Sequence, residues 1–378
     1  MSREILFYSD LPFGYHMADA EERMSRFVDR GYRVHYVEQL GIRDPRPRHL
    51  LRVARTLRSR PPAASAPFEV VSPKLLPPRR APLVRGLNRA WLTRQLRPLV
   101  EDPARTVLWL RYPTPELLPL VEREPWRVVV YEEIDDHEHS PGMNEGLRRI
   151  FREARQRVLA RSGVVFVSSE AMRERLARLH PNVVRAPAAA VDLAAFAPPV
   201  SGGPASERVA VYAGSIDFRF DSELVAAAAE HLPDWRFVIA GPADRRATGR
   251  LDELPNVELP GRLPAAEIPA LVAGAAVCLM PYRRDAFTDT VFPVKLVEYL
   301  AAGKPIVSTP IAAVGEFDDL VSVADGPGSF GPAILAAAQT DSDAARRTRV
   351  ERAVPFSWER RMDQLEDAIE AAARSRDG

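Results

Sequence analysis

Two side chains of opposite charge, Lys295 and Glu298, stand three residues apart near the start of a predicted helix. The segment Phe292–Thr309, FPVKLVEYLAAGKPIVST, predicts this helix, which Gly303 and then Pro305 bring to an end. Side chains three positions apart share a helix face. Free amides at the helix start and a lysine form an anion site, and one turn further on a carboxylate accepts hydrogen bonds from a pair of hydroxyls. A phosphate beside a diol describes a nucleotide.

The same segment predicts how this pair is positioned. Pro293 suits the first helical position, where its missing N–H costs nothing. A buried strand begins after the helix, at Ile306 and Val307. The residues expected to face the core at helical spacing are Leu296, Val297, Leu300 and Ala301.

Length and composition indicate a globular protein of more than one domain. A chain of 378 residues exceeds one ordinary core, so roughly two domains of 150–200 residues are expected. The single cysteine, Cys278, lies in an apolar run and excludes an internal disulfide, so a buried thiol and a reducing cytoplasm are expected. The first residues lack the long apolar segment and the cleavage site of a signal peptide. No apolar run approaches the ~20 residues that a membrane-spanning helix needs. We expect a cytoplasmic protein whose membrane contact, where there is any, is peripheral at the inner face.

Positive charge is concentrated in residues 42–100. This section holds 14 Lys and Arg against Asp44 and Glu69, a local balance of +12 in a chain of net charge +1. This concentration of positive charge indicates one of two things. Either the section binds an anionic surface or ligand, or it is a solvated, arginine-rich linker with a pair of helices. Leucines between Leu50 and Leu57 alternate with arginines as in an interfacial helix, and the helix expected at Leu83–Leu99 resembles it. Acceptors carried on anionic lipid would explain this pattern, and nucleic acid is disfavoured because no recognised binding module accompanies the charge.

Apolar strands alternate with amphipathic helices along both halves of the chain. This pattern indicates doubly wound parallel sheets, and a Pro-, Gly- and Ser-rich break at Phe196–Glu207 separates the two halves. A long amphipathic helix is expected at Trp358–Ala373. The expected strands include Glu4–Tyr8, Arg33–Glu38, Val107–Leu110, Val128–Tyr131, Gly163–Ser168, Val209–Ala213, Arg236–Ala240, Val257–Leu259, Val277–Met280 and Ile306–Ser308.

Neither half carries the glycine-rich fingerprint of a dinucleotide cofactor. Only Gly14 follows the first strand, and only Gly214 follows the first strand of the second half. A nicotinamide-dependent dehydrogenase is therefore disfavoured. One glycine still lets the backbone approach a phosphate-linked ligand closely.

Five segments in order resemble the donor domain of GT-B glycosyltransferases, particularly the bacterial glycogen-synthase-like family with the pattern P-x-K-x-x-E-Y-L-A. They are Val211–Asp221, Phe237–Pro242, Asn256–Leu263, Val277–Pro281 and Phe292–Thr309. The resemblance implies an α/β chain of two Rossmann-like, doubly wound parallel-sheet domains that face each other across a cleft. The implied parts are an acceptor-side domain (1–196), a linker (197–207), a donor-binding domain (208–357) and a helix that crosses back to the first domain (358–378).

The resemblance also implies roles for individual residues of the donor domain. Glu298 matches the second glutamate of the E-x7-E motif, which grips the ribose hydroxyls. Thr290 stands where the first glutamate belongs, so either Asp289 or backbone amides around Val291 are expected to hold the sugar. Lys295 matches the lysine that binds the diphosphate.

The turn after Gly214 lacks the cationic pair of many family members. The matching positions hold Ser215 and Phe220. A diphosphate leaving group needs its charge neutralised, so another cation must substitute. The candidates are Arg219, Arg262 and Arg283, of which Arg262 is favoured.

In the first half, an acidic run follows the strand Val128–Tyr131. It resembles the Y-D-x-x-D element of the subgroup, and Asp135, Asp136 or His137 is expected to accept a proton from the acceptor hydroxyl. The alternative is a solvated loop. A metal site is disfavoured because no further His or Cys cluster completes a coordination shell. His16 is expected to be a loop residue.

The resemblance implies a glycosyltransferase that moves a sugar from a nucleoside-diphosphate-sugar to a hydroxyl acceptor. It implies neither a metal ion nor a separate cofactor, and it favours cell-surface polysaccharide or glycoconjugate synthesis. Two alternatives stay open. One is a nucleotide-sugar epimerase on the same fold, and the other is a non-catalytic GT-B-like partner that binds nucleotide or glycan.

Overall fold

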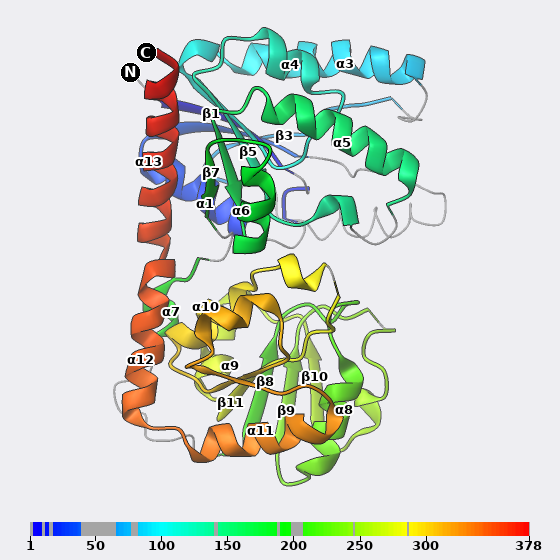
Figure 1. Ribbon diagram of the computed structural model, residues 1–378, viewed down its shortest axis with the longest axis vertical. Helices are drawn as coiled ribbons and strands as arrows, with labels where there is room; N and C mark the ends of the chain where they lie inside the picture. Colours follow the sequence, from blue (N-terminus) through cyan, green and yellow to red (C-terminus); the bar gives the residue numbers. More distant parts are fainter. Residues whose placement is uncertain are drawn as a thin grey trace. The chain divides into compact units, whose positions relative to one another are not determined.

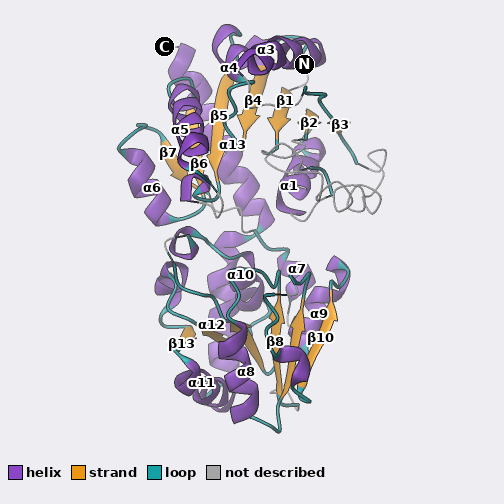
Figure 2. Cartoon of the chain, turned by 90° about the vertical axis from the view of Figure 1, so that its right-hand side faces the viewer, coloured by secondary structure: helices purple, strands orange, loops and turns teal. Residues whose placement is uncertain are grey.

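A computed structural model of the chain describes residues 3–9, 12–14, 18–38, 66–76, 82–139, 143–186, 190–197, 207–244, 246–285 and 287–377. The chain divides into two compact units (Figure 1). The first unit comprises Met1–Ala188 and Met362–Gly378, and the second comprises Ala189–Arg361. Each unit is built around one parallel sheet, as Figure 2 shows.

The first unit has a seven-stranded sheet in the order β3-β2-β1-β4-β5-β6-β7, and every pairing is parallel. Its strands are β1 (Arg3–Tyr8), β2 (Tyr32–Val37), β3 (Glu69–Val71), β4 (Thr106–Leu110), β5 (Val128–Glu133), β6 (Val164–Val167) and β7 (Val183–Arg185). Its helices are α1 (Ala18–Asp29), α3 (Pro82–Leu96), α4 (Leu118–Arg123), α5 (Glu145–Leu159), α6 (Glu170–Ala177) and α13 (Trp358–Asp377), the last from Met362 onward.

Both faces of this sheet are covered by helices. Leu6 and Leu108 point to one face, where α3, α4, α5 and α6 contribute to a single apolar cluster. Trp109 points to the other face and lies 5.7 Å from the ring of Phe27 on α1. Since successive side chains of a strand alternate between faces, continuous apolar strands are needed to bury both sides.

The C-terminal helix α13 packs on the first unit through one apolar face and a row of ion pairs. Leu365 and Ile369 are buried. Arg30 contacts Asp363 at 2.8 Å, and Arg127 contacts Glu370 at 2.6 Å. These contacts attach the end of the chain to the unit that contains its beginning.

The second unit has a six-stranded parallel sheet in the order β10-β9-β8-β11-β12-β13. Its strands are β8 (Val209–Ala213), β9 (Arg236–Ala240), β10 (Val257–Gly261), β11 (Val277–Met280), β12 (Ile306–Ser308) and β13 (Val321–Val323). Its helices are α7 (Leu193–Phe196), α8 (Ser222–His231), α9 (Ile268–Ala273), α10 (Val294–Ala301), α11 (Pro327–Gln339) and α12 (Asp343–Ala353). Helices α9 and α10 cover one face, and α8 and α11 cover the other.

The predicted fold class, two doubly wound parallel-sheet domains, is confirmed. The strands β3, β7 and β13 were not predicted, because they are three-residue edge strands without a fully buried apolar run. Cys278 is buried within β11, and burial raises the pKa of its thiol to about 12. The leucine and arginine pattern around Leu50 and the loop residue His16 lie outside the described residues. No helix in the described part of the chain is long and apolar enough to cross a membrane.

Helix α10 begins one residue later than predicted, because the backbone of Pro293 is extended (ψ 127°) and this residue precedes the first helical position. The four residues predicted to face the core are all buried. At the other end Gly303 adopts a left-handed conformation (φ +67°). Its N–H donates to Leu300 O and that of Lys304 to Tyr299 O, at 2.9 and 3.0 Å, which together form a Schellman cap.

We expect Gly303→Ala to lower the free energy of unfolding by about 1–3 kcal/mol, because alanine is strained in the left-handed region and its Cβ would meet the Arg346 side chain. Urea denaturation measures the change. Gly315→Ala is the matched control, since a methyl group added there would meet nothing within 4 Å and its φ is not positive. Equal stability of the two variants would contradict the role of this cap.

Candidate functional site

The carboxyl ends of three adjacent strands form one edge of the second unit. The Gly214 N–H donates to Ala240 O, and the Gly241 N–H donates to Gly261 O, both at 2.8 Å. A Cβ at Gly241 would overlap the carbonyl group of Gly214. Two loops therefore pack backbone against backbone here, at the edge where open parallel sheets bind their ligands.

Lys295 reaches this edge from the first turn of α10. Its Nζ donates to Tyr282 Oη at 2.8 Å and lies 5.0 Å from the ring centroid of Tyr212 and 5.2 Å from that of Tyr282. A Cβ at position 214 would stand 2.7 Å from the ammonium nitrogen. Gly214 therefore leaves the space that the lysine fills, and the structure brings together two residues predicted to bind the donor.

The ammonium of Lys295 stays protonated in this environment. Burial by itself lowers its pKa, but the two tyrosines beside it raise the pKa above the ordinary lysine value. A fixed positive charge held by aromatic rings and one hydroxyl suits a diphosphate group.

Glu298 lies one turn further along α10 and is partly buried. Burial raises the pKa of this carboxyl to about 7, and the nearby Lys295 opposes part of that rise. Among the described residues the carboxylate forms no hydrogen bond and no ion pair within 4 Å. Its oxygens are thus available to hydroxyl groups of a ligand.

Three tyrosines of this site were not predicted from the sequence. Tyr299 accepts a hydrogen bond from the N–H of Ala213 at 2.9 Å and so ties α10 to the end of β8. Tyr212 donates to Ser215 O at 2.7 Å and thereby fixes the turn after Gly214. Tyr212 is the penultimate residue of β8, and Tyr282 follows the end of β11 by two residues. Since β8 and β11 pair with each other, the proximity of the two tyrosines was detectable only from the strand order.

The three candidate arginines differ in the interactions that their guanidinium groups already make within the protein. Arg219 donates from Nε to Asp217 Oδ1 at 3.0 Å, and although burial would raise the pKa of Asp217, this ion pair lowers it. Arg283 donates from Nε to the carbonyl of Phe220 at 3.2 Å. Arg262 is exposed at the end of β10 and has no ion pair with any residue that the structure describes. Its charge is thus available, and it follows the Gly261 that bonds to Gly241.

The turn before α10 uses its backbone amides internally. The N–H groups of Thr290 and Val291 donate to the carbonyls of Phe287 and Thr288, at 3.0 and 3.2 Å. The Thr290 hydroxyl also donates to Phe287 O, at 2.7 Å. Two of the amides expected to hold the sugar are therefore occupied. Asp289 is partly buried, and within the described chain its carboxylate has no ion pair.

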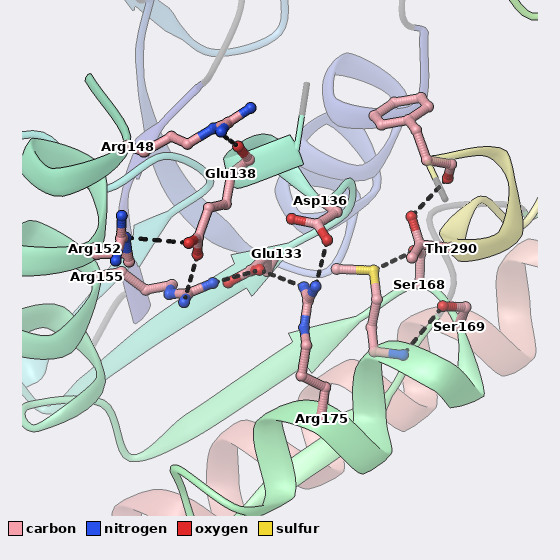
Figure 3. A network of polar contacts seen from close by, with 12 residues as sticks. Glu133, Asp136, Glu138, Arg148, Arg152, Arg155, Ser168, Ser169, Arg175 and Thr290 are labelled. Carbon is pink, nitrogen blue, oxygen red and sulfur yellow. Dashed lines mark hydrogen bonds and ion pairs between the residues drawn. The ribbon is translucent and has the colours of Figure 1, made fainter. Parts of the chain in front are cut away.

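In the first unit the acidic run is clamped by arginines (Figure 3). Glu133 accepts hydrogen bonds from Arg155 and Arg175, at 3.2 and 3.1 Å, and Asp136 pairs with Arg175. Both carboxylates are buried, so a solvated loop is wrong for them. Arg152 and Arg155 pair with the carboxylate of Glu138, and Arg148 donates to its backbone carbonyl.

The three predicted proton acceptors therefore have different surroundings. The His137 ring packs edge-on against Tyr112 and Phe151, with centroids 5.1 and 6.1 Å away. Asp136 is held by an ion pair, whereas Asp135 is only partly buried. Of these two carboxylates, Asp135 is the less buried. The described residues contain no group of three or more His, Cys, Asp or Glu side chains arranged to hold a metal ion.

Comparison with solved structures identifies the architecture. Sucrose-phosphate synthase of Thermosynechococcus elongatus aligns over 99% of this chain and 100% of its own, with a TM-score of 0.70 and 14% identity. HepE of Anabaena, solved with UDP, aligns over 98% of this chain and 100% of its own, with a TM-score of 0.66 and 15% identity. The fold is GT-B. At these identities the likeness establishes the fold alone.

Two further comparisons match shorter parts of the chain. Residues 207–340 match the family described as glycosyl transferases group 1. TuaH of Bacillus subtilis, assigned as a teichuronic acid biosynthesis glycosyltransferase, is 33% identical over 108 residues. This match spans 28% of the chain and 27% of the length of TuaH. Together these matches support a glycosyltransferase.

We expect Asp136→Asn to lower the free energy of unfolding by about 1–2 kcal/mol, because it removes a buried ion pair with Arg175. Asp135→Asn, at a less buried position, is expected to lower stability by less than Asp136→Asn does. Thermal and urea unfolding of both variants measure the difference. A larger loss in Asp135→Asn would reverse the two roles assigned here.

Proposed function

We propose that the protein is a glycosyltransferase that moves a sugar from a nucleoside-diphosphate-sugar donor to a hydroxyl acceptor. The observation that carries the proposal is the position of Lys295, whose ammonium fills the space left by Gly214. One turn away stands the carboxylate of Glu298, which is unpaired among the described residues. Both lie in the segment that matches glycosyl transferases group 1. A cation and an available carboxylate at one sheet edge suit a diphosphate and a ribose diol.

In the proposed reaction Lys295 and Arg262 neutralise the diphosphate, whose negative charge grows as the bond to the sugar breaks. Tyr282 and Tyr212 hold the ammonium in place before the substrate arrives. Ser215 belongs to the turn that follows Gly214 and would lie against the phosphates. Glu298 would accept hydrogen bonds from the ribose hydroxyls. The proposal assigns no metal ion or separate cofactor, since these cations meet the charge.

The sugar and the acceptor involve different carboxylates. Asp289 would bind the sugar, because Thr290 has no carboxylate and its amide is used in the turn. Asp135, which is less buried than Asp136, would take the proton from the acceptor hydroxyl. That proton leaves as the acceptor oxygen bonds to the sugar carbon and the diphosphate departs.

The comparisons support the class of donor and the kind of product. HepE is solved with UDP and with UDP-glucose, and TuaH is assigned to teichuronic acid synthesis. We accordingly propose a role in cell-surface polysaccharide or glycoconjugate synthesis. We place the enzyme in the cytoplasm, with the basic section 42–100 bringing it to the inner face of an anionic membrane.

One observation favours a second candidate, a non-catalytic nucleotide- or glycan-binding partner. Thr290 stands where the family pattern has a glutamate, so the sugar end of the site lacks its usual acid.

Donor turnover separates the two candidates. The protein is incubated with UDP-, GDP- or TDP-sugars, and release of the nucleoside diphosphate is measured. We expect release from one donor class and at least a tenfold loss of rate in Lys295→Met, because the leaving group loses its cation. Lys74→Met, at an exposed lysine of the other unit, is the control. Nucleotide binding without release from any donor would favour the non-catalytic partner.

The pKa of Glu298, about 7, predicts a pH dependence of donor binding. Ribose hydroxyls donate to the carboxylate and stabilise its charged form, so binding below pH 7 requires loss of a proton. Affinity for UDP-glucose is therefore expected to fall as the pH decreases from 8 to 6, by up to about tenfold per unit below the pKa.

Calorimetric titration of wild type and Glu298→Gln measures this effect. The esterified diphosphate of UDP-glucose does not titrate in this range, whereas a terminal phosphate has a pKa of about 6. Glu298→Gln should bind more weakly at pH 8 and show a flat profile. An unchanged slope in this variant would assign the titration to another group.

A further inference from the structure

Helix α3 presents an apolar stripe to solvent. Leu83, Leu87 and Trp91 are 79%, 52% and 48% exposed, at spacings of four residues. Gly86 and Ala90 are exposed between them. At 3.6 residues per turn these five residues lie within about 140° of the helix circumference. We call them the α3 stripe.

The opposite side of α3 already has its partners. Leu92 and Leu96 are buried in the core of the first unit, and the amide of Asn88 bonds to Leu76 of the preceding segment. The helix therefore has one apolar face toward the sheet and a second toward solvent. Figures 1 and 2 both show α3 at the margin of its unit, together with α4.

Exposed large apolar side chains at helical spacing indicate a surface that binds something apolar. Single exposed apolar residues are ordinary, but a row of leucine, leucine and tryptophan on one helix is not. The stripe ends at Arg94, which is exposed and has no ion pair with any described residue.

Charge decides between the two plausible occupants of the stripe. Residues 82–100 contain no Asp or Glu, and the whole section 42–100 has a balance of +12. A second copy of the chain seated on its own stripe would place two such helices against each other, each with four arginines and no acidic residue in 82–100, at an electrostatic cost. An anionic bilayer instead attracts the arginines while its acyl region accepts the apolar side chains.

We propose that α3 lies in the interface of an anionic membrane, with Leu83, Leu87 and Trp91 inserted at the boundary between headgroups and acyl chains. The helix axis is then parallel to the bilayer plane. Tryptophan suits this depth because its ring is apolar and its N–H finds a polar partner at the headgroups. The proposal deepens the proposed function, since it names the surface that would bring the transferase to a membrane.

A hollow lies on another side of α3, away from the stripe. It has a volume of about 550 Å³ and lies between α3 and the start of α5, with Arg85 and Arg149 among its lining residues. Leu147 and Ile150 contribute apolar surface to the same hollow. Glu153 lines the hollow as well and lies 4.0 Å from Arg149, so part of its basic charge is already matched.

The chain contains its own reporter for this contact. All five tryptophans lie in the described part, and Trp109, Trp126, Trp235 and Trp358 are at most 7% exposed. Trp91 is therefore the tryptophan whose emission should respond to lipid.

The test uses the full chain with vesicles of phosphatidylcholine containing about 30 mol% phosphatidylglycerol, and with vesicles of phosphatidylcholine alone. Flotation and the blue shift of tryptophan emission measure binding. We expect binding to the anionic vesicles, weakening at about 0.5 M salt as screening increases, and at least tenfold weaker partitioning of the double variant Leu83→Gln/Leu87→Gln. Trp91→Phe should keep binding and lose the shift.

Leu179→Gln is the matched control, because Leu179 is 56% exposed in the same unit but outside the stripe. UDP-glucose binding and thermal stability of the double variant should equal those of wild type, which excludes misfolding. Absence of vesicle binding, or equal binding by the double variant, overturns the proposal. Self-association that the double variant abolishes would assign the stripe to a second copy instead. Vesicle binding needs no donor, so this test and the turnover test fail independently.

Discussion

The candidate donor site depends on one steric relation, the absence of a side chain at position 214. The ammonium of Lys295 occupies the volume that a Cβ of residue 214 would take, and two tyrosines hold it there. Position 241 must also be a glycine, because a Cβ there would overlap the backbone of Gly214. Two strand ends and the first turn of α10 therefore converge only because both glycines lack side chains. The positive charge is consequently in place before any ligand arrives.

The first unit uses charge in a different way. Its acidic run after β5 is neutralised by arginines from α5 and α6, so that most of the charges stabilise the loop and are not free for chemistry. Glu132 extends this principle into the core, where burial would raise the pKa of its carboxyl but Arg23 and Arg111 lower it. Buried carboxylates of this kind are retained only with such partners. Asp135 differs from them in its greater exposure.

Much of the fold was predictable because both sheets are built from continuous apolar strands, and each such run must be buried on two faces. The apolar face of α10 and the burial of Cys278 followed from the same reasoning and are confirmed. The short edge strands were not predictable, since three residues carry no periodic signal. The start of α10 differed by one residue because Pro293 fixes only φ, whereas ψ decides whether the helix has begun.

The sequence by itself determined the two-domain α/β architecture and the residue types Lys295 and Glu298 at helical spacing. Local periodicity and residue chemistry are sufficient for those conclusions. Only the tertiary structure decided which charges remain available. Arg219, Arg262 and Arg283 are the same residue type in the sequence. In the structure Arg219 pairs with Asp217 and Arg283 donates to a backbone carbonyl, whereas Arg262 has no such partner among the described residues. It also decided that α3 has a second apolar face. The partners and the exposure of a side chain depend on residues that are distant along the chain. The spacing of residues within one segment therefore cannot predict them.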